Sequence, residues 1–313
     1  MKDSSMWKGV FPALVTPFKA DGEIDEPAFR ENVDMSIEED GVQGILVGGC
    51  TGEFWALTPE ERVQIVEWGV EQARGRVPVI AGTGGIRTRD VIELTAHAKS
   101  AGADAALILP PFFVKVGLRE LLAHYGAVAT SVGLPLVVYN VPAATGLNLT
   151  PEILDRLVEI PSVVAVKESS GDFNQFFNTV RTVGDRVAVF CGVSSLFGMA
   201  AVTVGAAGYI CTSPQTLGRD VVDLYRLSVE GQYDRALEIQ KKGVGFRHLS
   251  IANGRNMYVS CKEIMNQLGR PGGFPRLPLL PLEEPDRQQI REGIARLGLR
   301  ARGPARSAQD GRV

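Results

Sequence analysis

Short apolar runs that alternate with helical segments constrain the fold of this chain more than any other feature. Three of these runs begin beside a proline: Val77–Gly82, Leu134–Tyr139 and Ile160–Val166. A run that is apolar throughout is typical of a parallel strand buried on both faces. Between the runs, the pairs Thr58–Pro59 and Thr150–Pro151 indicate helix starts, because a threonine N-cap precedes a proline at the first helical position. The order of elements is therefore β-α-β-α.

A second recurring pattern supports this order. The segments Asp40–Val47, Ala101–Leu109 and Val204–Ile210 each contain a glycine that ends a helix, followed by a turn into an apolar run. Counted in this way, the chain has eight predicted strands, near Val10–Val15, Ile45–Val47, Val79–Ala81, Ala105–Leu109, Leu136–Tyr139, Val163–Lys167, Val187–Cys191 and Gly208–Cys211. Eight parallel strands with intervening helices predict an α/β fold, a (β/α)8 TIM barrel, within residues 1–216.

A doubly wound sheet is the structural alternative to the barrel. Such a sheet usually carries a nucleotide site. Neither G-x-G-x-x-G after a first strand nor G-x-x-x-x-G-K-[ST] occurs here in the right context.

Beyond the barrel the pattern becomes helical. We expect a C-terminal helical extension over residues 217–300, with helices at Asp220–Val229, Tyr233–Lys242, Phe246–Leu268 and Glu284–Leu297. Residues 301–313 lack apolar periodicity and are predicted to form a disordered tail.

Charge and hydropathy exclude several kinds of partner. The net charge is −3, with acidic and basic residues interspersed, so the chain has no basic stripe for nucleic acid. No run approaches the roughly 20 apolar residues that span a bilayer, and the first residues lack the apolar core of a signal peptide. We therefore expect a cytoplasmic protein with no nucleic-acid or membrane partner.

The cysteines and histidines show no metal-site pattern. The four cysteines are too scattered for a zinc site and fit a reducing compartment: Cys50, Cys191, Cys211 and Cys261. The three histidines lie at no ligand spacing from one another, and we expect them to be structural or exposed: His97, His124 and His248. The sequence thus predicts no metal.

Lys167 ends the apolar run of the predicted sixth strand. Nothing about solubility explains an amine at the end of a buried strand. Desolvation disfavours the ammonium form and lowers the pKa, and a neutral lysine amine can attack a carbonyl to form a Schiff base. The alternative is a lysine whose long side chain extends from the strand end to solvent. The position by itself leaves both interpretations open.

Two further segments are unusual at the rim where a TIM barrel places its functional groups, the C-terminal ends of the strands. Gly48–Phe54 is a glycine-rich loop after the second strand, and its backbone N–H groups can bind a carboxylate without a cationic side chain. Tyr139–Pro142 follows the fifth strand and places a phenol at the rim. Tyr139 and Lys167 therefore come from neighbouring strands, as proton transfer to and from a lysine-bound imine requires.

Four segments together resemble one known family. They are Thr16–Phe18, Gly49–Glu53, Tyr139–Pro142 and Lys167–Gly171. In this order and near this spacing they are similar to the pyruvate-dependent class I aldolases and lyases typified by dihydrodipicolinate synthase and N-acetylneuraminate lyase. The resemblance extends over most of the chain. It implies that Lys167 forms a Schiff base with a 2-oxo acid, usually pyruvate, and that Tyr139 shuttles protons. Because the imine is the electron sink, no organic cofactor is implied.

The same resemblance implies how the 2-oxo acid is held. Gly49 and the backbone amides of Cys50 and Thr51 would bind its carboxylate, and Thr51 would supply a relay hydroxyl. Ile210 matches a position whose backbone carbonyl faces the bound keto acid. The family also implies a homo-oligomer, with a homotetramer as the expected form.

Two departures from the family pattern bear on the substrate. Dihydrodipicolinate synthases carry an arginine at the position of Ala144, where it holds the second substrate's carboxylate, and alanine cannot replace it unless another arginine, such as Arg87, reaches in. Many relatives carry a tyrosine at the position of Phe113, which crosses a subunit interface to complete a proton relay. Phenylalanine keeps the ring but removes the proton donor. Simple apolar contact at an interface is the alternative role for Phe113.

Three hypotheses follow. The first is a lyase that reversibly cleaves a 4-hydroxy-2-oxo acid or a 2-keto-3-deoxy sugar acid to pyruvate and an aldehyde. The second is a dehydratase or deaminase of a deoxy-keto acid that uses the same imine, with dihydrodipicolinate synthase proper as a related alternative. The third is a barrel that binds a keto acid without turnover. Specificity is expected from side chains around the rim and from the C-terminal helices: Phe54, Trp55, Phe112, Phe113, Ala144 and Ser194.

Overall fold

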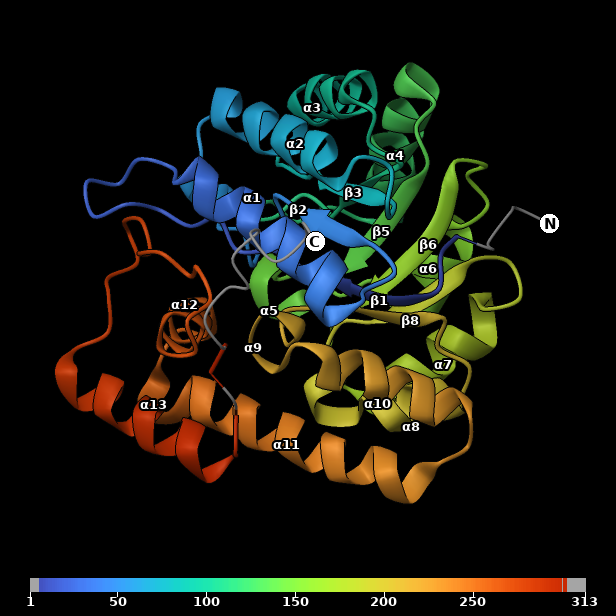
Figure 1. The fold of residues 1–313 in the computed structure, drawn as a ribbon. Helices are drawn as coiled ribbons and strands as arrows, with labels where there is room; N and C mark the ends of the chain where they lie inside the picture. The colour runs from blue at the N-terminus through green and yellow to red at the C-terminus, as the bar shows by residue number, and fades with distance from the viewer. Residues whose placement is uncertain (1–5, 300, 303–313) are drawn as a thin grey trace, which may run out of the picture.

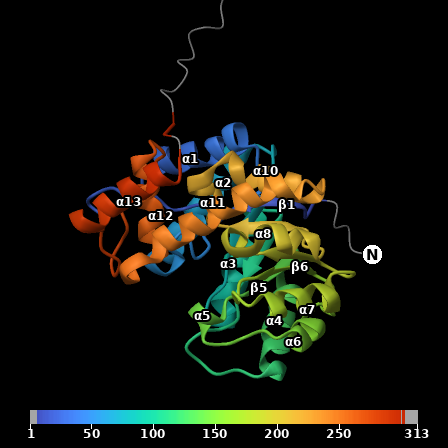
Figure 2. The ribbon, with the colours of Figure 1, turned by 90° about the horizontal axis from the view of Figure 1, so that it is seen from below.

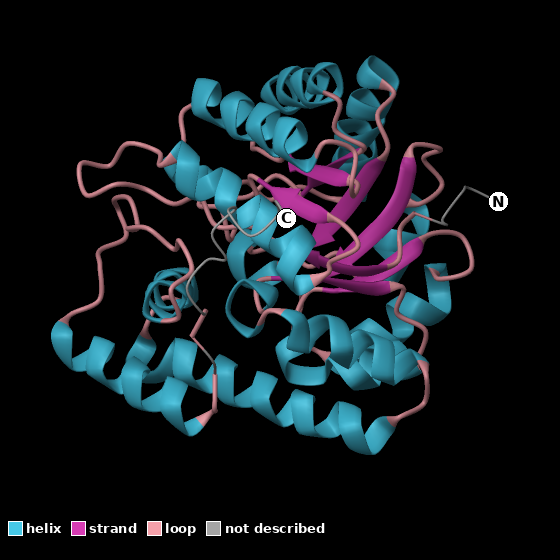
Figure 3. Cartoon of the chain, viewed as in Figure 1, coloured by secondary structure: helices cyan, strands magenta, loops and turns pink. Residues whose placement is uncertain are grey.

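Eight parallel strands form the centre of the molecule, and helices surround them (Figures 1 and 3). The strands are β1 Gly9–Pro12, β2 Ile45–Val47, β3 Val79–Gly82, β4 Ala105–Ile108, β5 Leu136–Asn140, β6 Val163–Glu168, β7 Ala188–Cys191 and β8 Gly208–Cys211. They lie in the order β1-β8-β7-β6-β5-β4-β3-β2. The predicted (β/α)8 TIM barrel is confirmed, with most strand boundaries within one residue; β1 is the exception and is shorter than predicted.

The barrel closes between β1 and β2 through a short bridge instead of a full ladder. Leu14 donates its amide to the Leu46 carbonyl at 2.9 Å, and Gln43 donates to the Val10 carbonyl at 3.0 Å. Ala13 and Leu46 form an isolated parallel bridge. Pro12, the last residue of β1, has no amide to donate and so adds no bond of its own to a neighbouring strand.

The helices on the outside of the barrel begin and end where local signals indicate. They are α1 Glu26–Asp34, the π-helix η1 Met35–Asp40, α2 Pro59–Ala73, α3 Thr88–Ala101, α4 Leu118–Val132, α6 Pro151–Leu157, α7 Phe173–Val183, α8 Ser194–Thr203 and α10 Arg219–Val229. Short helical turns sit in the loops: η2 Phe54–Ala56, α5 Pro142–Thr145 and α9 Pro214–Leu217. A capping box of Thr58 and Glu61 starts α2. Gly102, at φ +93°, ends α3 in the left-handed conformation.

The core has two layers because successive strand residues face opposite sides of the barrel wall. The inner layer fills the barrel with side chains such as Phe11, Leu107 and Phe190. The outer layer packs the wall against the surrounding helices, with side chains such as Val47, Val138 and Val166. On β6, Ala165 belongs to the inner layer and Val166 to the outer layer, so Lys167 has the inward parity.

The last part of the chain forms three helices that group together at one side of the barrel (Figure 2). They are α11 Tyr233–Ile251, α12 Met257–Gln267 and α13 Glu284–Arg296. The prediction of a break between the helices Tyr233–Lys242 and Phe246–Leu268 was wrong. The chain turns later, at η3 Ala252–Gly254, where Asn253 adopts φ +57°, and Asn256 then caps α12. Polar Asn253 interrupts the helix because it tolerates this left-handed conformation.

The described residues are 6–299 and 301–302, so all but the first two residues of the predicted tail lie outside them. The boundary predicted at residue 217 stays a prediction. Within the described chain, no helix is long and apolar enough to cross a bilayer.

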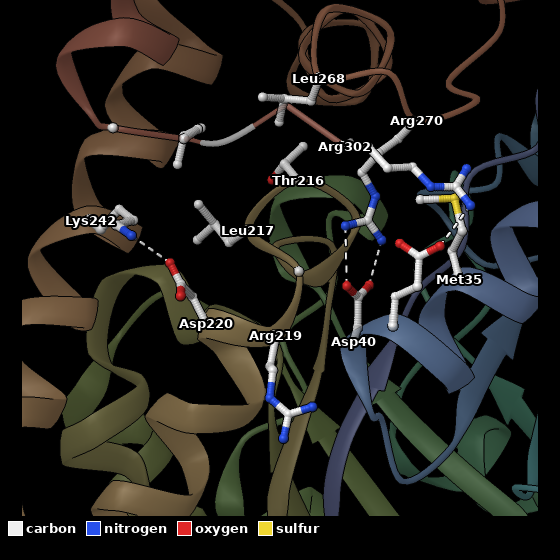
Figure 4. Close-up of a pocket in the computed structure, with 14 residues that line it drawn as sticks. Met35, Asp40, Thr216, Leu217, Arg219, Asp220, Lys242, Leu268, Arg270 and Arg302 are labelled. Carbon is white, nitrogen blue, oxygen red and sulfur yellow. Dashed lines mark hydrogen bonds and ion pairs between the residues drawn. The ribbon is translucent and has the colours of Figure 1, made fainter. Parts of the chain in front are cut away.

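A polar cavity of about 520 Å³ marks the place where the C-terminal region meets the barrel (Figure 4). It lies between η1, the start of α10 and α11, and three ion pairs line it. Arg270 pairs with the buried Asp40 of η1, and Lys242 pairs with Asp220 at 2.5 Å. Arg302 bonds Glu39 of η1 at 2.6 Å. These contacts tie the C-terminal region to η1 and α10.

Candidate active site

Lys167 lies inside the mouth of the barrel, at the end of β6. Its neighbour on β5 is Tyr139, and the lysine Nζ sits 4.1 Å from the centre of the tyrosine ring. Lys167 is only 4% exposed, so the alternative of a side chain that extends into solvent does not hold in this structure. Burial lowers the pKa of Lys167 to about 8, although the nearby Cys50 and Cys211 thiols act in the opposite direction. The amine is thus poised to lose its proton near neutral pH.

Tyr139 is a buried phenol that stays protonated. Burial raises the pKa of Tyr139 well above its ordinary value, and Cys50 and Tyr258 add to this effect, while Ser169 opposes it. The Lys167 Nζ lies over the face of the Tyr139 ring, and the Cys50 and Ser169 side chains are near the tyrosine hydroxyl. A neutral phenol in this position can donate a proton and, once it has done so, take one back.

Asn140 and Glu168 hold the ends of β5 and β6 together. They directly follow Tyr139 and Lys167 in the chain. Asn140 donates to the Glu168 carboxylate at 2.8 Å and accepts the Leu149 amide at 2.9 Å. Glu168 also accepts the Ser170 amide at 2.6 Å. Both side chains are buried on the outer side of the barrel wall. The bonds therefore hold the register that brings the phenol beneath the amine.

The glycine-rich loop after β2 folds back on itself beside this pair. The amides of Gly52 and Glu53 donate to carbonyls within the loop, at 3.0 Å each. Among the described backbone groups, no carbonyl accepts the amides of Cys50 or Thr51. The Thr16 hydroxyl, in the segment after β1, holds the loop by donating to the Gly52 carbonyl at 2.7 Å. The prediction that the Cys50 and Thr51 amides bind a carboxylate is thus compatible with this geometry, and it stays a prediction.

The side chains of Cys50 and Thr51 point to different partners. Thr51 forms a hydroxyl–hydroxyl hydrogen bond of 2.7 Å with Thr212, which follows β8. Cys50 lies in the inner layer with Tyr139, and its thiol neighbours both the phenol and Lys167. Burial raises the pKa of Cys50, so the thiol keeps its proton. The Cys50 thiol therefore neighbours the Tyr139 phenol, and the predicted relay role of Thr51 stays a prediction.

A buried ion pair that sequence reasoning missed supports the loop. Glu53 is fully buried at φ +53° and pairs with Lys262 of α12. The same lysine donates to the Thr16 carbonyl at 2.7 Å and to the Phe274 carbonyl at 2.8 Å. More than 200 residues separate the two partners, so no local pattern announces the pair. The available hint in the sequence was Glu53 itself, a charged residue that ends a glycine-rich loop and belongs to no helical or strand pattern.

The remaining predicted residues lie at different depths. Ile210 is buried in the inner layer, and Gly49 packs against Leu46. Ala144 is exposed on α5. Phe113 is 93% exposed at φ +72°. Arg87 pairs with Asp90, and its side chain is 70% exposed.

The other cysteines and the histidines have structural surroundings. All four cysteines are buried and unpaired. His124 is buried and hydrogen-bonds Thr88 at 2.9 Å, whereas His97 and His248 are exposed. Among the residues described, no group of three or more histidine, cysteine or acidic side chains could hold a metal ion.

Comparison with known proteins places this geometry in context. The sequence matches the model of the Dihydrodipicolinate synthetase family over residues 6–297. It is 38% identical over 288 residues to a 4-hydroxy-tetrahydrodipicolinate synthase from Geotalea uraniireducens (strain Rf4), covering 91% of this chain and 97% of that protein.

Two solved structures share the fold and differ in their named roles. YagE, a prophage protein of the dihydrodipicolinic acid synthase family from E. coli K12 in complex with pyruvate, is 30% identical with a TM-score of 0.89, covering 94% of this chain and 99% of that one. N-acetylneuraminate lyase from Fusobacterium nucleatum is 25% identical with a TM-score of 0.85, covering 93% and 99%.

Proposed function

Since the chain belongs to the dihydrodipicolinate synthetase family of pyruvate-dependent, class I aldolase-type lyases, we propose a reaction of that class for it. The proposed reaction is the reversible cleavage of a 4-hydroxy-2-oxo acid or a 2-keto-3-deoxy sugar acid to pyruvate and an aldehyde. One observation carries the proposal. The Lys167 amine, with its pKa lowered to about 8, lies on the face of the Tyr139 ring inside the barrel mouth. An unprotonated amine beside a phenol is the pair that imine chemistry needs.

The proposed reaction uses the residues of this chain alone. The Lys167 Nζ attacks the C2 carbonyl of the substrate, and Tyr139 gives its proton to the resulting C2 hydroxyl, which leaves as water and yields a protonated imine and a tyrosinate. The tyrosinate then takes the proton of the 4-hydroxyl, the C3–C4 bond breaks to release the aldehyde, and the electron pair of that bond moves into the imine to form an enamine. Protonation at C3 and hydrolysis then release pyruvate and restore the amine. The cationic imine nitrogen is the electron sink of the step.

The carboxylate of the 2-oxo acid is proposed to bind the loop after β2. The amides of Cys50 and Thr51 would donate to it, with Gly49 allowing close approach and the Ile210 carbonyl facing the bound acid. Cys50 is a second candidate for the relay beside Thr51. Its thiol neighbours the Tyr139 phenol and can exchange a proton with it, and the Thr51 hydroxyl is hydrogen-bonded to Thr212.

The product distinguishes cleavage from its alternatives. Ala144 is exposed and Arg87 pairs with Asp90, so neither supplies the arginine expected of dihydrodipicolinate synthase proper. Phe113 is exposed and lacks the hydroxyl that would donate a proton in the relay of many relatives. A dehydratase or deaminase therefore stays the second candidate. Pyruvate and an aldehyde indicate cleavage, whereas a new keto acid of unchanged carbon number indicates loss of water or ammonia.

The enzyme is proposed to be a cytoplasmic homotetramer that takes pyruvate as a product or substrate. The pyruvate complex of YagE supports the ligand. Exposed apolar side chains near the loop after β4, including Phe113, Val114, Ile86 and Trp55, support self-association. Native mass spectrometry measures the assembly, and a monomer at micromolar concentration would contradict it.

Borohydride trapping tests the proposed chemistry. We expect that incubation with pyruvate and borohydride leaves a reduced pyruvate adduct on the Lys167 peptide, detected by mass spectrometry. Lys167→Ala should abolish the adduct, whereas Lys115→Ala, at an exposed loop lysine, should not change it. An adduct elsewhere, or none in the folded protein, would remove Lys167 as the imine-forming residue.

A further inference from the structure

Tyr258, at the start of α12, brings a second phenol to the barrel mouth. Its ring packs against the inner layer that contains Cys50 and Tyr139, and it contacts Trp55 with ring centres 5.4 Å apart. Burial, with a smaller effect from Cys50, raises the pKa of Tyr258, so its hydroxyl is a neutral donor near the thiol. The barrel strands do not supply this group. The C-terminal helices therefore form part of the site wall.

Arg247 of α11 lies beside that phenol and has an incomplete set of partners. Among the described residues it forms no ion pair, and its described hydrogen bond is a long contact of 3.6 Å to the Met257 sulphur. Met257 directly precedes Tyr258 in α12, so this contact places the Arg247 guanidinium at the start of the helix that carries the phenol, and its positive charge lowers the pKa of Tyr258. Most other arginines of the C-terminal region are paired with carboxylates, as Arg255 is with Asp286 and Arg270 with Asp40.

The surroundings of the two groups favour an anionic ligand. Phe54, Trp55 and Phe112 form a chain of ring contacts that leads to Tyr258, with centres 5.4–6.2 Å apart. Beside such apolar surfaces water screens charge poorly, so an unpaired guanidinium gains most from a carboxylate or phosphate. The phenol adds a neutral hydrogen bond to the same oxygen atoms.

We propose that Arg247 and Tyr258 bind a second anionic group at the end of the substrate remote from its 2-oxo acid, so that the substrate is a dianionic 2-oxo acid. The inference rests on the proposed function, because Lys167 and the loop after β2 are taken to hold the 2-oxo acid itself. It names a substrate class for this site, and it gives the C-terminal helices the role of selecting it.

Trapping matched pairs of 2-oxo acids on Lys167 tests the inference without knowledge of the aldehyde. The probes are dicarboxylic acids (2-oxoglutarate, 2-oxoadipate and 2-oxopimelate) and their neutral-tailed counterparts of equal chain length. We expect at least one dicarboxylate to reach half-maximal borohydride trapping at a concentration roughly 10- to 100-fold below its counterpart, as a charge-assisted bond implies. A parallel pair, 2-keto-3-deoxygluconate with and without a 6-phosphate, distinguishes phosphate from carboxylate as the preferred anion.

Variants assign the preference to the two residues. Arg247→Met should remove the preference, Arg247→Lys should restore part of it, and Tyr258→Phe should reduce it several-fold. Arg235→Met on the same helix and Tyr233→Phe at its start are matched controls that should keep it. Each ratio is taken within one protein, so a variant that folds poorly lowers both arms together.

The outcomes separate this inference from the proposed function. If pyruvate gives no adduct on Lys167, the proposed function fails. If pyruvate is trapped but neither a dicarboxylate nor the phosphorylated acid is preferred, the inference alone is overturned. The inference also fails if Arg247→Met weakens charged and neutral probes equally, because the arginine would then bind the shared carboxylate or only support the turn to α12.

Discussion

The buried environment of Lys167 gives this residue its chemistry. An ordinary lysine, with a pKa near 10.5, is only about 0.03% free amine at pH 7, whereas a pKa of about 8 leaves roughly one-tenth unprotonated. Burial thus raises the concentration of the nucleophile by more than two orders of magnitude. The Tyr139 ring compensates in part by interacting with the ammonium form at 4.1 Å.

This shift predicts the pH profile of imine formation. The rate of pyruvate trapping, measured at saturating borohydride, should rise about tenfold per pH unit below pH 8 and level off above it, because only the free amine attacks. Quenched samples analysed by mass spectrometry give the rate. A rate that continues to rise up to pH 10 would show that Lys167 has an ordinary pKa.

At the scale of the element, the loop after β2 depends on a helix that is distant in sequence. Glu53 holds a left-handed backbone conformation that few non-glycine residues adopt, at the end of the loop that carries Cys50 and Thr51. The ion pair with Lys262 and the Thr16 hydroxyl bond keep it there. Helix α12 is therefore a support for the proposed carboxylate site as well as part of its wall.

Removing one partner of this pair should damage both folding and binding. Lys262→Met leaves the Glu53 carboxylate buried without its cation and should lower the free energy of unfolding by about 3–5 kcal/mol. Urea unfolding measures the loss. The remaining folded protein should need more pyruvate for half-maximal trapping, since the loop is no longer held.

Two control variants test the cause of that loss. The double variant Glu53→Gln with Lys262→Met removes the unpaired charge and should recover part of the stability. Lys241→Met breaks an exposed pair with Glu238 and should cost at most about 0.5 kcal/mol. Equal losses in Lys262→Met and Lys241→Met would contradict a special role for the buried pair.

At the scale of the whole molecule, the C-terminal region is joined to the barrel by buried charge. Asp40 at the end of η1 is 4% exposed, and burial raises the pKa of Asp40 even though Arg270 lowers it. Arg270 forms a two-point contact with that carboxylate, seen beside the cavity of Figure 4. The pair bridges 230 positions of the chain.

Arg270→Met should destabilise the fold in a pH-dependent manner. Without its cation, Asp40 has a still higher pKa in the folded state than in the unfolded state, so protonation favours folding. The variant should lose about 3–5 kcal/mol at pH 7 and less near pH 4.5, since stability falls as pH rises through the folded pKa. Urea unfolding at the two pH values measures this. Arg156→Met, which breaks an exposed pair with Glu159, is the control and should show little loss at either pH.

The order of elements in this chain follows from local signals. Apolar runs, threonine–proline starts and left-handed glycines act over a few residues, and they were sufficient to predict eight strands, the TIM barrel and the neighbouring positions of Tyr139 and Lys167. The division of α11 and α12 was predicted wrongly because periodicity continues through the turn and only Asn253 and Gly254 interrupt it.

What the sequence by itself determined is therefore the barrel and the strand ends that carry an amine and a phenol. Only the tertiary structure decided which side chains meet there: Cys50 against Tyr139, Thr51 against Thr212, and Glu53 against Lys262. It also brought Tyr258 over the mouth. The physical reason is that periodicity reports which face of an element is buried, whereas hydrogen bonds and ion pairs join single residues far apart in the chain and leave no repeating pattern.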